Sequence, residues 1–243
     1  MNTRPGIQSA APHRDRERSD LFWLSTADIC HIRLDDVPMD KYSGFEHLSA
    51  NESRGVDYEV RLRHGSSGIA VISIHGGAIE PGTSEIAEAV AGAEHTFYTL
   101  RGIKKTGNTD LHITSTRFDE PVALEIACNS ETVISIHGCS DGEEVVYVGG
   151  TDSRLRECIE AKLRQAGFKA LGGAPNSSGR NKRNICNRSR RGMGVQLEIS
   201  KGLRVRMLGD LSHVRDQAGG IFDEFVHAVR EAITESFSSQ FSV

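Results

Sequence analysis

The feature that most constrains the fold is a hexapeptide, Val-Ile-Ser-Ile-His-Gly, that occurs at residues 71–76 and again at 133–138. Each copy is an apolar, mostly β-branched run closed by glycine, which predicts a buried strand that ends at the edge of a sheet. The two strands therefore end in histidine, His75 in the first and His137 in the second. In an open α/β sheet, ligands bind outside the carboxyl ends of the strands, so neighbouring strands of this kind would bring both imidazoles into one crevice.

Glu80 stands five residues after His75, on the loop that leaves the first of these strands. Two imidazoles and one carboxylate, with a fourth position left to water, make up a common type of catalytic zinc site. A single histidine at a strand end is more often a hydrogen-bonded structural residue, and this alternative stays open for either histidine taken alone. The repeat and the nearby carboxylate favour metal binding by the three residues together.

Length and composition narrow the class of protein. The 243 residues suffice for one α/β domain with a sizeable core. Residues 1–36 lack steady periodicity and predict a flexible N-terminal extension, which leaves 37–243 as the folded domain. The formal charge of -4 gives no general attraction to nucleic acid or to anionic membranes, so we expect neither as a partner.

The cysteines and the hydropathy of the sequence indicate the cellular compartment in which the protein folds. The five cysteines are scattered and form no Cys-x-x-Cys pair, which indicates reduced thiols. No apolar stretch is long enough for a membrane span or a signal-peptide core. We therefore expect a cytoplasmic protein, which cell lysis could release to act outside the cell. The oligomeric state is not indicated by the sequence.

Strands alternate with helices along the chain, which predicts an α/β domain with a mixed open sheet flanked by helices. Besides the two repeats, the patterns predict strands at 56–63, 95–100, 111–116, 143–148 and 193–199, and helices at 83–91, from 121, from 153 and at 221–237. The strand expected at 111–116 carries His112 on its polar face. There His112 could support a metal ligand, contact a substrate or be merely hydrogen-bonded at the surface.

Glu198 lies in the apolar run 195–199. An apolar environment would disfavour its charged form, which suits a general base that accepts a proton from water and returns it to a leaving amine. Because Gln196 alternates with it, the pattern alone fits an outward-facing strand residue better.

Six cations and no acidic residue lie between Gly179 and Gly192, in a chain that is acidic overall. They are Arg180, Lys182, Arg183, Arg188, Arg190 and Arg191. Such a cluster is usually a solvated loop or a phosphate-binding patch. This one leads directly into the strand of Glu198, where it would also suit an anionic ligand.

Several motifs together carry a family resemblance. They are residues 73–80, 82–87, 107–108, 111–115, 118–121, 135–138, 184–188 and 195–199. In these motifs the chain resembles the poly-γ-glutamate hydrolase family, zinc peptidases of phages and bacteria with a carboxypeptidase-like fold. The resemblance spans about residues 42–207 and leaves out the N-terminal extension. It departs from the familiar His-x-x-Glu spacing of carboxypeptidases, because four residues separate His75 from Glu80.

The resemblance implies a zinc-dependent hydrolase that cleaves γ-glutamyl amide bonds of the anionic polymer poly-γ-glutamate. Zinc would be held by His75, Glu80 and His137, with Glu198 in the general-base position. A polymer with a free α-carboxylate on every residue needs cations at its binding site, and arginine binds carboxylates through two parallel hydrogen bonds. Arg188, in an Asn-Arg pair with Asn187, is the leading candidate for this contact, and Asn187 and His112 are further substrate-binding candidates.

Two other functions remain open at this stage. A zinc amidase or peptidase acting on peptidoglycan would use the same ligands, and its substrate also contains γ-glutamyl links. A non-catalytic nucleic-acid-binding protein would use the basic stretch at 180–191 and need no metal. The absence of aromatic residues near that stretch disfavours nucleic-acid binding.

Overall fold

The computed structural model describes Met1 and residues 40–174, 178–212 and 220–238. The N-terminal extension expected over residues 1–36 lies, apart from Met1, outside the described residues, so this expectation stays untested.

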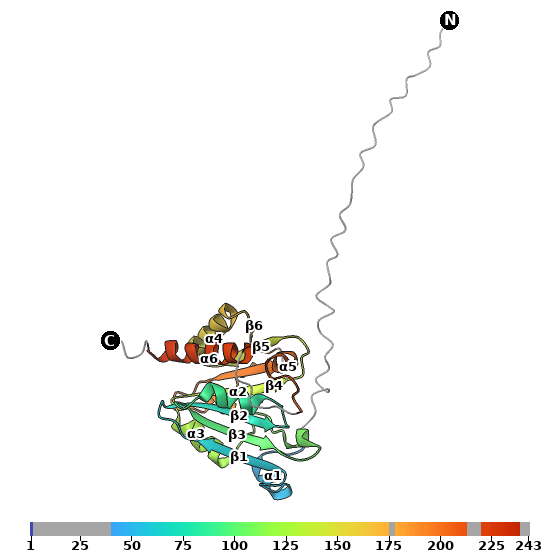
Figure 1. The fold of residues 1–243 in the computed structure, drawn as a ribbon, viewed down its shortest axis with the longest axis vertical. Coiled ribbons are helices and arrows are strands. Elements are labelled where there is room, and N and C mark those ends of the chain that lie inside the picture. The colour runs from blue at the N-terminus through green and yellow to red at the C-terminus, as the bar shows by residue number, and fades with distance from the viewer. Residues whose placement is uncertain (2–39, 175–177, 213–219, 239–243) are drawn as a thin grey trace. The chain divides into compact units, whose positions relative to one another are not determined.

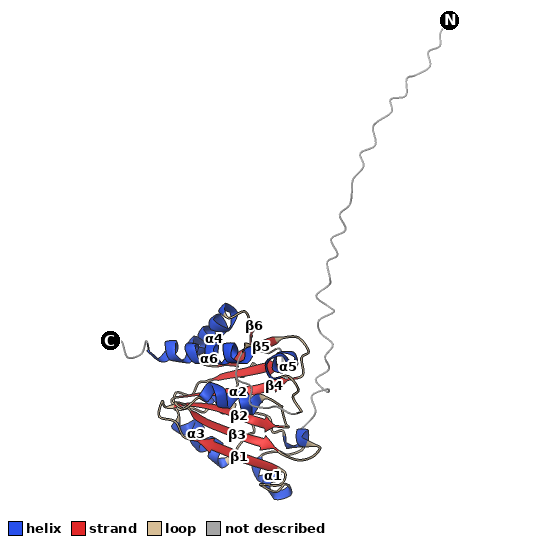
Figure 2. Ribbon diagram, viewed as in Figure 1, coloured by secondary structure: helices blue, strands red, loops and turns tan. Residues whose placement is uncertain are grey.

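A seven-stranded sheet forms the centre of the domain (Figures 1 and 2), with the spatial order β1-β3-β2-β4-β7-β5-β6. The strands are β1 (Tyr58–Arg63), β2 (Ile69–Gly77), β3 (Thr96–Gly102), β4 (Thr132–Cys139), β5 (Val145–Gly150), β6 (Lys169–Gly172) and β7 (Val195–Ser200). The four central strands β3, β2, β4 and β7 run parallel to one another, whereas β1 is antiparallel to β3 and β5 is antiparallel to β7. The expected α/β class with a mixed open sheet is confirmed.

Helices cover both faces of this sheet (Figure 2). They are α1 (Phe45–Asn51), α2 (Thr83–Ala91), α3 (Pro121–Asn129), α4 (Ser153–Gln165), α5 (Lys201–Leu208) and α6 (Ile221–Ser238), with short 3₁₀ helices η2 (Asn108–Leu111) and η3 (Ile185–Asn187). One apolar core joins the sheet to α2, α4, α5 and α6, and a second joins its other face to α1, α3, η2 and η3. β2 is buried from Ile69 to Gly76 because both cores pack against it. Among the described residues, no helix is long and apolar enough to cross a membrane.

The strand order marks the carboxyl end of β2 as the place where an α/β sheet of this kind binds ligands. From β2 the chain passes through α2 to β3 on one side, and after α3 it returns to β4 on the other side. The order of the strands therefore reverses beside β2, and such a reversal opens a crevice where α/β proteins bind ligands. His75, His137 and Glu198 lie near the carboxyl ends of β2, β4 and β7, three adjacent parallel strands.

The prediction of a strand at residues 111–116 is wrong. η2 ends at Leu111, and a loop follows in which Leu111 and Ile113 are buried in the second core. The alternating pattern arises from these two buried side chains, while the N–H of Thr114 donates to Asp40 instead of to a strand. The elements that were not expected include β6 and α5, whose sequences carry too little apolar periodicity.

Candidate active site

His75 and His137 face each other through their Nδ1 atoms, which are 3.2 Å apart. Glu80 joins them: its Oε1 lies 3.0 Å from Nδ1 of His75, and its Oε2 lies 3.9 Å from Nδ1 of His137. Both histidines are only 2% exposed. Nitrogen and oxygen ligands about 2.0–2.2 Å from a tetrahedral zinc lie about 3.3 Å from one another. These three side chains therefore have the donor atoms and the spacing of zinc ligands.

The second ring nitrogen of each imidazole, Nε2, has a hydrogen-bond partner within the protein. Nε2 of His75 lies 2.9 Å from the carbonyl oxygen of Ile113, an acceptor, so Nε2 carries the proton. Nε2 of His137 lies 2.8 Å from Oγ of Ser135. Metal-binding histidines usually have such a partner on their second nitrogen, which fixes the ring and directs the other lone pair to the metal. In both rings the nitrogen left for a metal is Nδ1.

Burial and mutual contact shift the pKa values of these three groups. Burial would lower the pKa of His75, but the charge and hydrogen bond of Glu80 raise it instead. Burial, followed by the charge of His75, lowers the pKa of His137 to about 3. Burial would raise the pKa of Glu80, yet His75 and the N–H of Gly138 help to lower it to about 2. A neutral His137 and an ionised Glu80 are the forms that bind a metal cation.

Glu198 lies beside this trio because of the register between β4 and β7, in which it is the partner of His137. Only 9% of Glu198 is exposed, so it is not the outward-facing residue that the alternation suggested. Nε2 of Gln196 donates to Oε1 of Glu198 at 2.7 Å, and Asn184 in turn donates to Gln196. The polar alternation in β7 thus belongs to a buried hydrogen-bonded chain that includes Glu198.

His112 lies on the other side of His75. Their ring centroids are 4.0 Å apart with a tilt of 32°, and Nε2 of His112 is 3.9 Å from Oε1 of Glu80. His75, Glu80 and His112 also offer ligand atoms within 4.8 Å of one another. A metal lies in the plane of the imidazole that binds it, whereas His112 is stacked over the face of His75. The rings of His75 and His137 cross at 72°, which favours His137 as the third ligand.

The structure does not bring Asn187 and Arg188 to the cluster formed by His75, Glu80 and His137. They lie at the end of η3, on the segment that leads to the amino end of β7. The amide of Asn187 donates to two backbone carbonyls and accepts from the N–H of Gly194. The half-buried Arg188 side chain makes no hydrogen bond or ion pair with the part of the chain that the structure describes.

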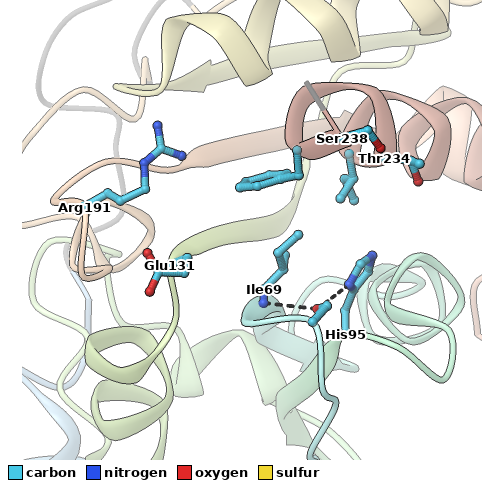
Figure 3. Close-up of a pocket in the computed structure, with 9 residues that line it drawn as sticks. Ile69, His95, Glu131, Arg191, Thr234 and Ser238 are labelled. Carbon is cyan, nitrogen blue, oxygen red and sulfur yellow. Dashed lines mark hydrogen bonds between the residues drawn. The ribbon is translucent and has the colours of Figure 1, made fainter. Parts of the chain in front are cut away.

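A separate hollow of about 530 Å³ lies at the opposite end of the central strands from the histidines (Figure 3). Its lining includes Ile69 at the start of β2, Glu131 just before β4, and Arg191 just before β7. These are the amino ends of the parallel strands, whereas the histidines lie at the carboxyl ends. Arg190 pairs with Glu131, and Arg191 pairs with Asp152, so two cations of the basic stretch are held away from the histidines.

Sequence reasoning missed Arg204, a buried cation beside the cluster. Its guanidinium donates to the carbonyl oxygens of Pro81 at 2.6 Å, Cys139 at 3.0 Å and Ile199 at 3.1 Å. Arg204 thereby ties the loop after β2, which carries Glu80, to the end of β4. No local pattern marks this role, because two of the partners are backbone atoms far away in the chain.

A mixed α/β sheet with two histidines and a glutamate converging at the carboxyl ends of its central strands is typical of metal-dependent hydrolases. Comparison with known proteins specifies the class further. The chain belongs to the poly-gamma-glutamate hydrolase family, whose sequence profile matches residues 42–228, and is accordingly a hydrolase.

Curated relatives come from Bacillus subtilis (strain 168). UPF0714 protein YndL is 42% identical over 201 residues, a match that covers 79% of this chain and 75% of YndL. The SPbeta prophage-derived UPF0714 protein YoqZ is 35% identical over 201 residues, covering 81% of this chain and 73% of YoqZ.

Two solved structures are also similar. A bacteriophage poly-gamma-glutamate hydrolase has a TM-score of 0.80 and 32% identity, covering 83% of this chain and 100% of that chain. A zinc-free apo structure of YndL has a TM-score of 0.77 and 38% identity, covering 82% of this chain and 100% of that chain. These matches confirm the zinc carboxypeptidase-like fold class expected from the sequence.

Proposed function

We propose that this chain is a zinc-dependent hydrolase that cleaves the γ-glutamyl amide bonds of poly-γ-glutamate, with His75, Glu80 and His137 as the zinc ligands. The observation that carries the proposal is the convergence of two Nδ1 atoms and a carboxylate at the spacing of zinc ligands. Family membership supports the substrate, and the zinc-free description of the YndL structure supports the metal.

Amide hydrolysis at neutral pH needs an activated water molecule and a proton for the leaving nitrogen. Zinc at this site would activate the water and act as a Lewis acid on the amide carbonyl. Glu198, on the strand next to His137, would take the proton from the attacking water and return it to the leaving amine. The hydrogen bond from Gln196 orients the Glu198 carboxylate for this role.

Substrate contacts are proposed for His112 from its position and for Arg188 and Asn187 from the family resemblance. The guanidinium of Arg188, which has no hydrogen bond or ion pair within residues 40–174, 178–212 and 220–238, would bind an α-carboxylate through two hydrogen bonds. Asn187 would have to exchange one of its internal hydrogen bonds for one to substrate. If Arg188 has this role, Arg188→Lys raises KM, because lysine keeps the charge and loses the planar pair of donors; an unchanged KM excludes the contact.

The test is depolymerisation of poly-γ-glutamate by zinc-loaded protein, followed by gel filtration. We expect the polymer to shorten with wild type and to stay long with Glu198→Gln at equal zinc content. Parallel incubation with peptidoglycan tests the rival substrate. Release of cell-wall fragments with no shortening of poly-γ-glutamate would overturn the proposal in favour of a peptidoglycan amidase.

A further inference from the structure

Asp40 is a buried acid at the edge of the site, two residues ahead of the region matched by the family profile. Its Oδ1 accepts from Nδ1 of His112 at 2.7 Å. Its Oδ2 accepts from the backbone N–H of Thr114 at 2.7 Å and from the guanidinium of Arg117 at 2.5 Å. The Asp40 side chain is only 3% exposed. Three donors therefore hold this carboxylate in one orientation, and Arg117 balances its charge.

The contact with Asp40 sets both the orientation and the tautomer of His112. An ionised carboxylate only accepts hydrogen bonds, so Nδ1 of His112 must carry a proton. In the neutral imidazole, Nε2 then carries a lone pair. Nε2 is on the side of the cluster, 3.9 Å from Oε1 of Glu80, and 37% of the His112 side chain is exposed. A ligand can therefore reach an acceptor atom whose direction the protein has fixed.

The chemistry of a γ-glutamyl chain limits what such an acceptor can bind. Within the chain, the amide carbonyls and the ionised α-carboxylates are acceptors, and the amide N–H is the donor. A lone pair at Nε2 therefore selects the amide N–H.

We propose that Asp40 is a positioning residue for His112, and that His112 accepts a hydrogen bond through Nε2 from an amide N–H of a γ-glutamyl substrate. The identity of the substrate rests on the proposed function, whereas the coupling of Asp40 to His112 does not. Nothing in the sequence pattern pointed to Asp40, since it is 72 residues from its partner.

A double-mutant cycle tests the coupling through kcat/KM on poly-γ-glutamate. Asp40→Asn and His112→Ala should each lower kcat/KM at least tenfold, and the double variant should be no worse than His112→Ala alone. Asp119→Asn is the matched control. Asp119 also accepts a backbone hydrogen bond, from the N–H of Phe45 at the start of α1 at 2.6 Å, but it is not part of the site. Additive losses, or no loss with Asp40→Asn, would overturn the proposal.

A second comparison tests the N–H contact itself. In a γ-glutamyl ester analogue an oxygen replaces the amide N–H, so it offers no donor to Nε2. His112→Ala should lower kcat/KM at least tenfold on the amide and less than threefold on the ester. Equal losses on both substrates would refute the N–H contact.

Long-range ¹H–¹⁵N spectra of the imidazoles decide the role of Asp40 without any substrate, with the His112 signal identified by its loss in His112→Ala. Wild type should show the Nδ1–H tautomer, and Asp40→Asn should shift the population toward Nε2–H. A tautomer that Asp40→Asn leaves unchanged would refute the positioning role. If wild type fails to cleave poly-γ-glutamate, the proposed function falls, and the spectra still decide whether Asp40 positions His112.

Discussion

Gly138, at the carboxyl end of β4, should not tolerate even a methyl side chain. A Cβ built there would lie 2.6 Å from Cζ of Arg204 and 2.9 Å from each of its terminal nitrogens, distances that real Cβ atoms essentially never show. The φ angle of Gly138 is not positive, so an alanine backbone is acceptable and the obstacle is the contact alone. Arg204 cannot simply rotate away, because its guanidinium donates to three backbone carbonyls.

The free-energy cost of Gly138→Ala depends on whether the guanidinium of Arg204 stays in place or moves. If the guanidinium stays, overpacking costs about 1–3 kcal/mol. If it moves, each hydrogen bond lost from this charged donor costs about 1.5–3 kcal/mol and leaves a buried carbonyl without a donor. We therefore expect a loss of about 3 kcal/mol in the free energy of unfolding. In a chain of this length about 2–4 °C accompanies each kcal/mol, which gives a fall in Tm of about 6–12 °C.

Thermal unfolding followed by circular dichroism measures this loss. Gly142→Ala is the matched control, since a Cβ at Gly142 meets nothing within 4 Å and its φ is also not positive. The control should stay within about 0.5 kcal/mol of wild type. In an Arg204→Ala background the obstacle is gone, so Gly138→Ala should then cost less than about 1 kcal/mol. If Gly138→Ala unfolds at the same temperature as the control, Arg204 is not fixed as described.

Three further predictions concern the cluster. Glu198→Gln should keep zinc and lower kcat by about 10²–10⁴, because the amide cannot accept the proton, and kcat at the wild-type value would exclude Glu198 as the base. Ser135→Ala removes the partner of Nε2 of His137 and should weaken zinc binding by about 10–100-fold in a chelator competition, whereas unchanged affinity would show that this contact is dispensable. Metal-free protein should lose stability as the pH falls below 6.5, because the pKa of His137 drops to about 3 on folding and the unfolded chain binds the proton more readily. Glu80, with a pKa lowered from 4.5 to about 2, adds to the loss below pH 4.5, while the raised pKa of His75 acts in the opposite direction. A Tm that stays constant from pH 7 to pH 4 would contradict this sign.

The hexapeptide repeat predicted two adjacent strands, yet its two copies do not present the same side chains to the same face. Val71 pairs with Ile134 instead of with its counterpart Val133, a shift of one residue that sends equivalent side chains to opposite faces. Val71 accordingly packs in the first core and Val133 in the second. An irregularity in the pairing of β2 with β3, between Ser73 and Gly76, accompanies the turn of His75 toward His137.

The identical serines and glycines of the repeat also have different roles, which no sequence pattern could distinguish. Oγ of Ser73 donates to Thr83 in α2, whereas Oγ of Ser135 lies 2.8 Å from Nε2 of His137. Gly76 makes room for the hydroxyl groups of Ser84 and Thr99, and its counterpart in β4 makes room for an arginine. The local periodicity was sufficient to locate the strands, but these contacts depend on which elements pack against each strand.

Residues whose partners are distant in the chain could not be found from the sequence. Asp40 acts on a histidine 72 residues away, and Arg204 reaches the carbonyl of Pro81 across 123 residues. Glu198 could be placed on a strand, but its burial could not be predicted, because local spacing does not show which segments, such as the one that carries Asn184, contact the polar face of β7. Sequence patterns report local spacing, so they indicated the histidines at the strand ends and missed the groups that orient them.

The most direct test of the proposed zinc site is the zinc content of the purified chain and its alanine variants. We expect about one zinc per chain in wild type, loss of zinc in His75→Ala, Glu80→Ala and His137→Ala, and retention of zinc in His112→Ala, whose ring contacts the cluster without being a proposed ligand. Full zinc occupancy in any of the first three variants, or loss of zinc in His112→Ala, would contradict the proposed ligand set.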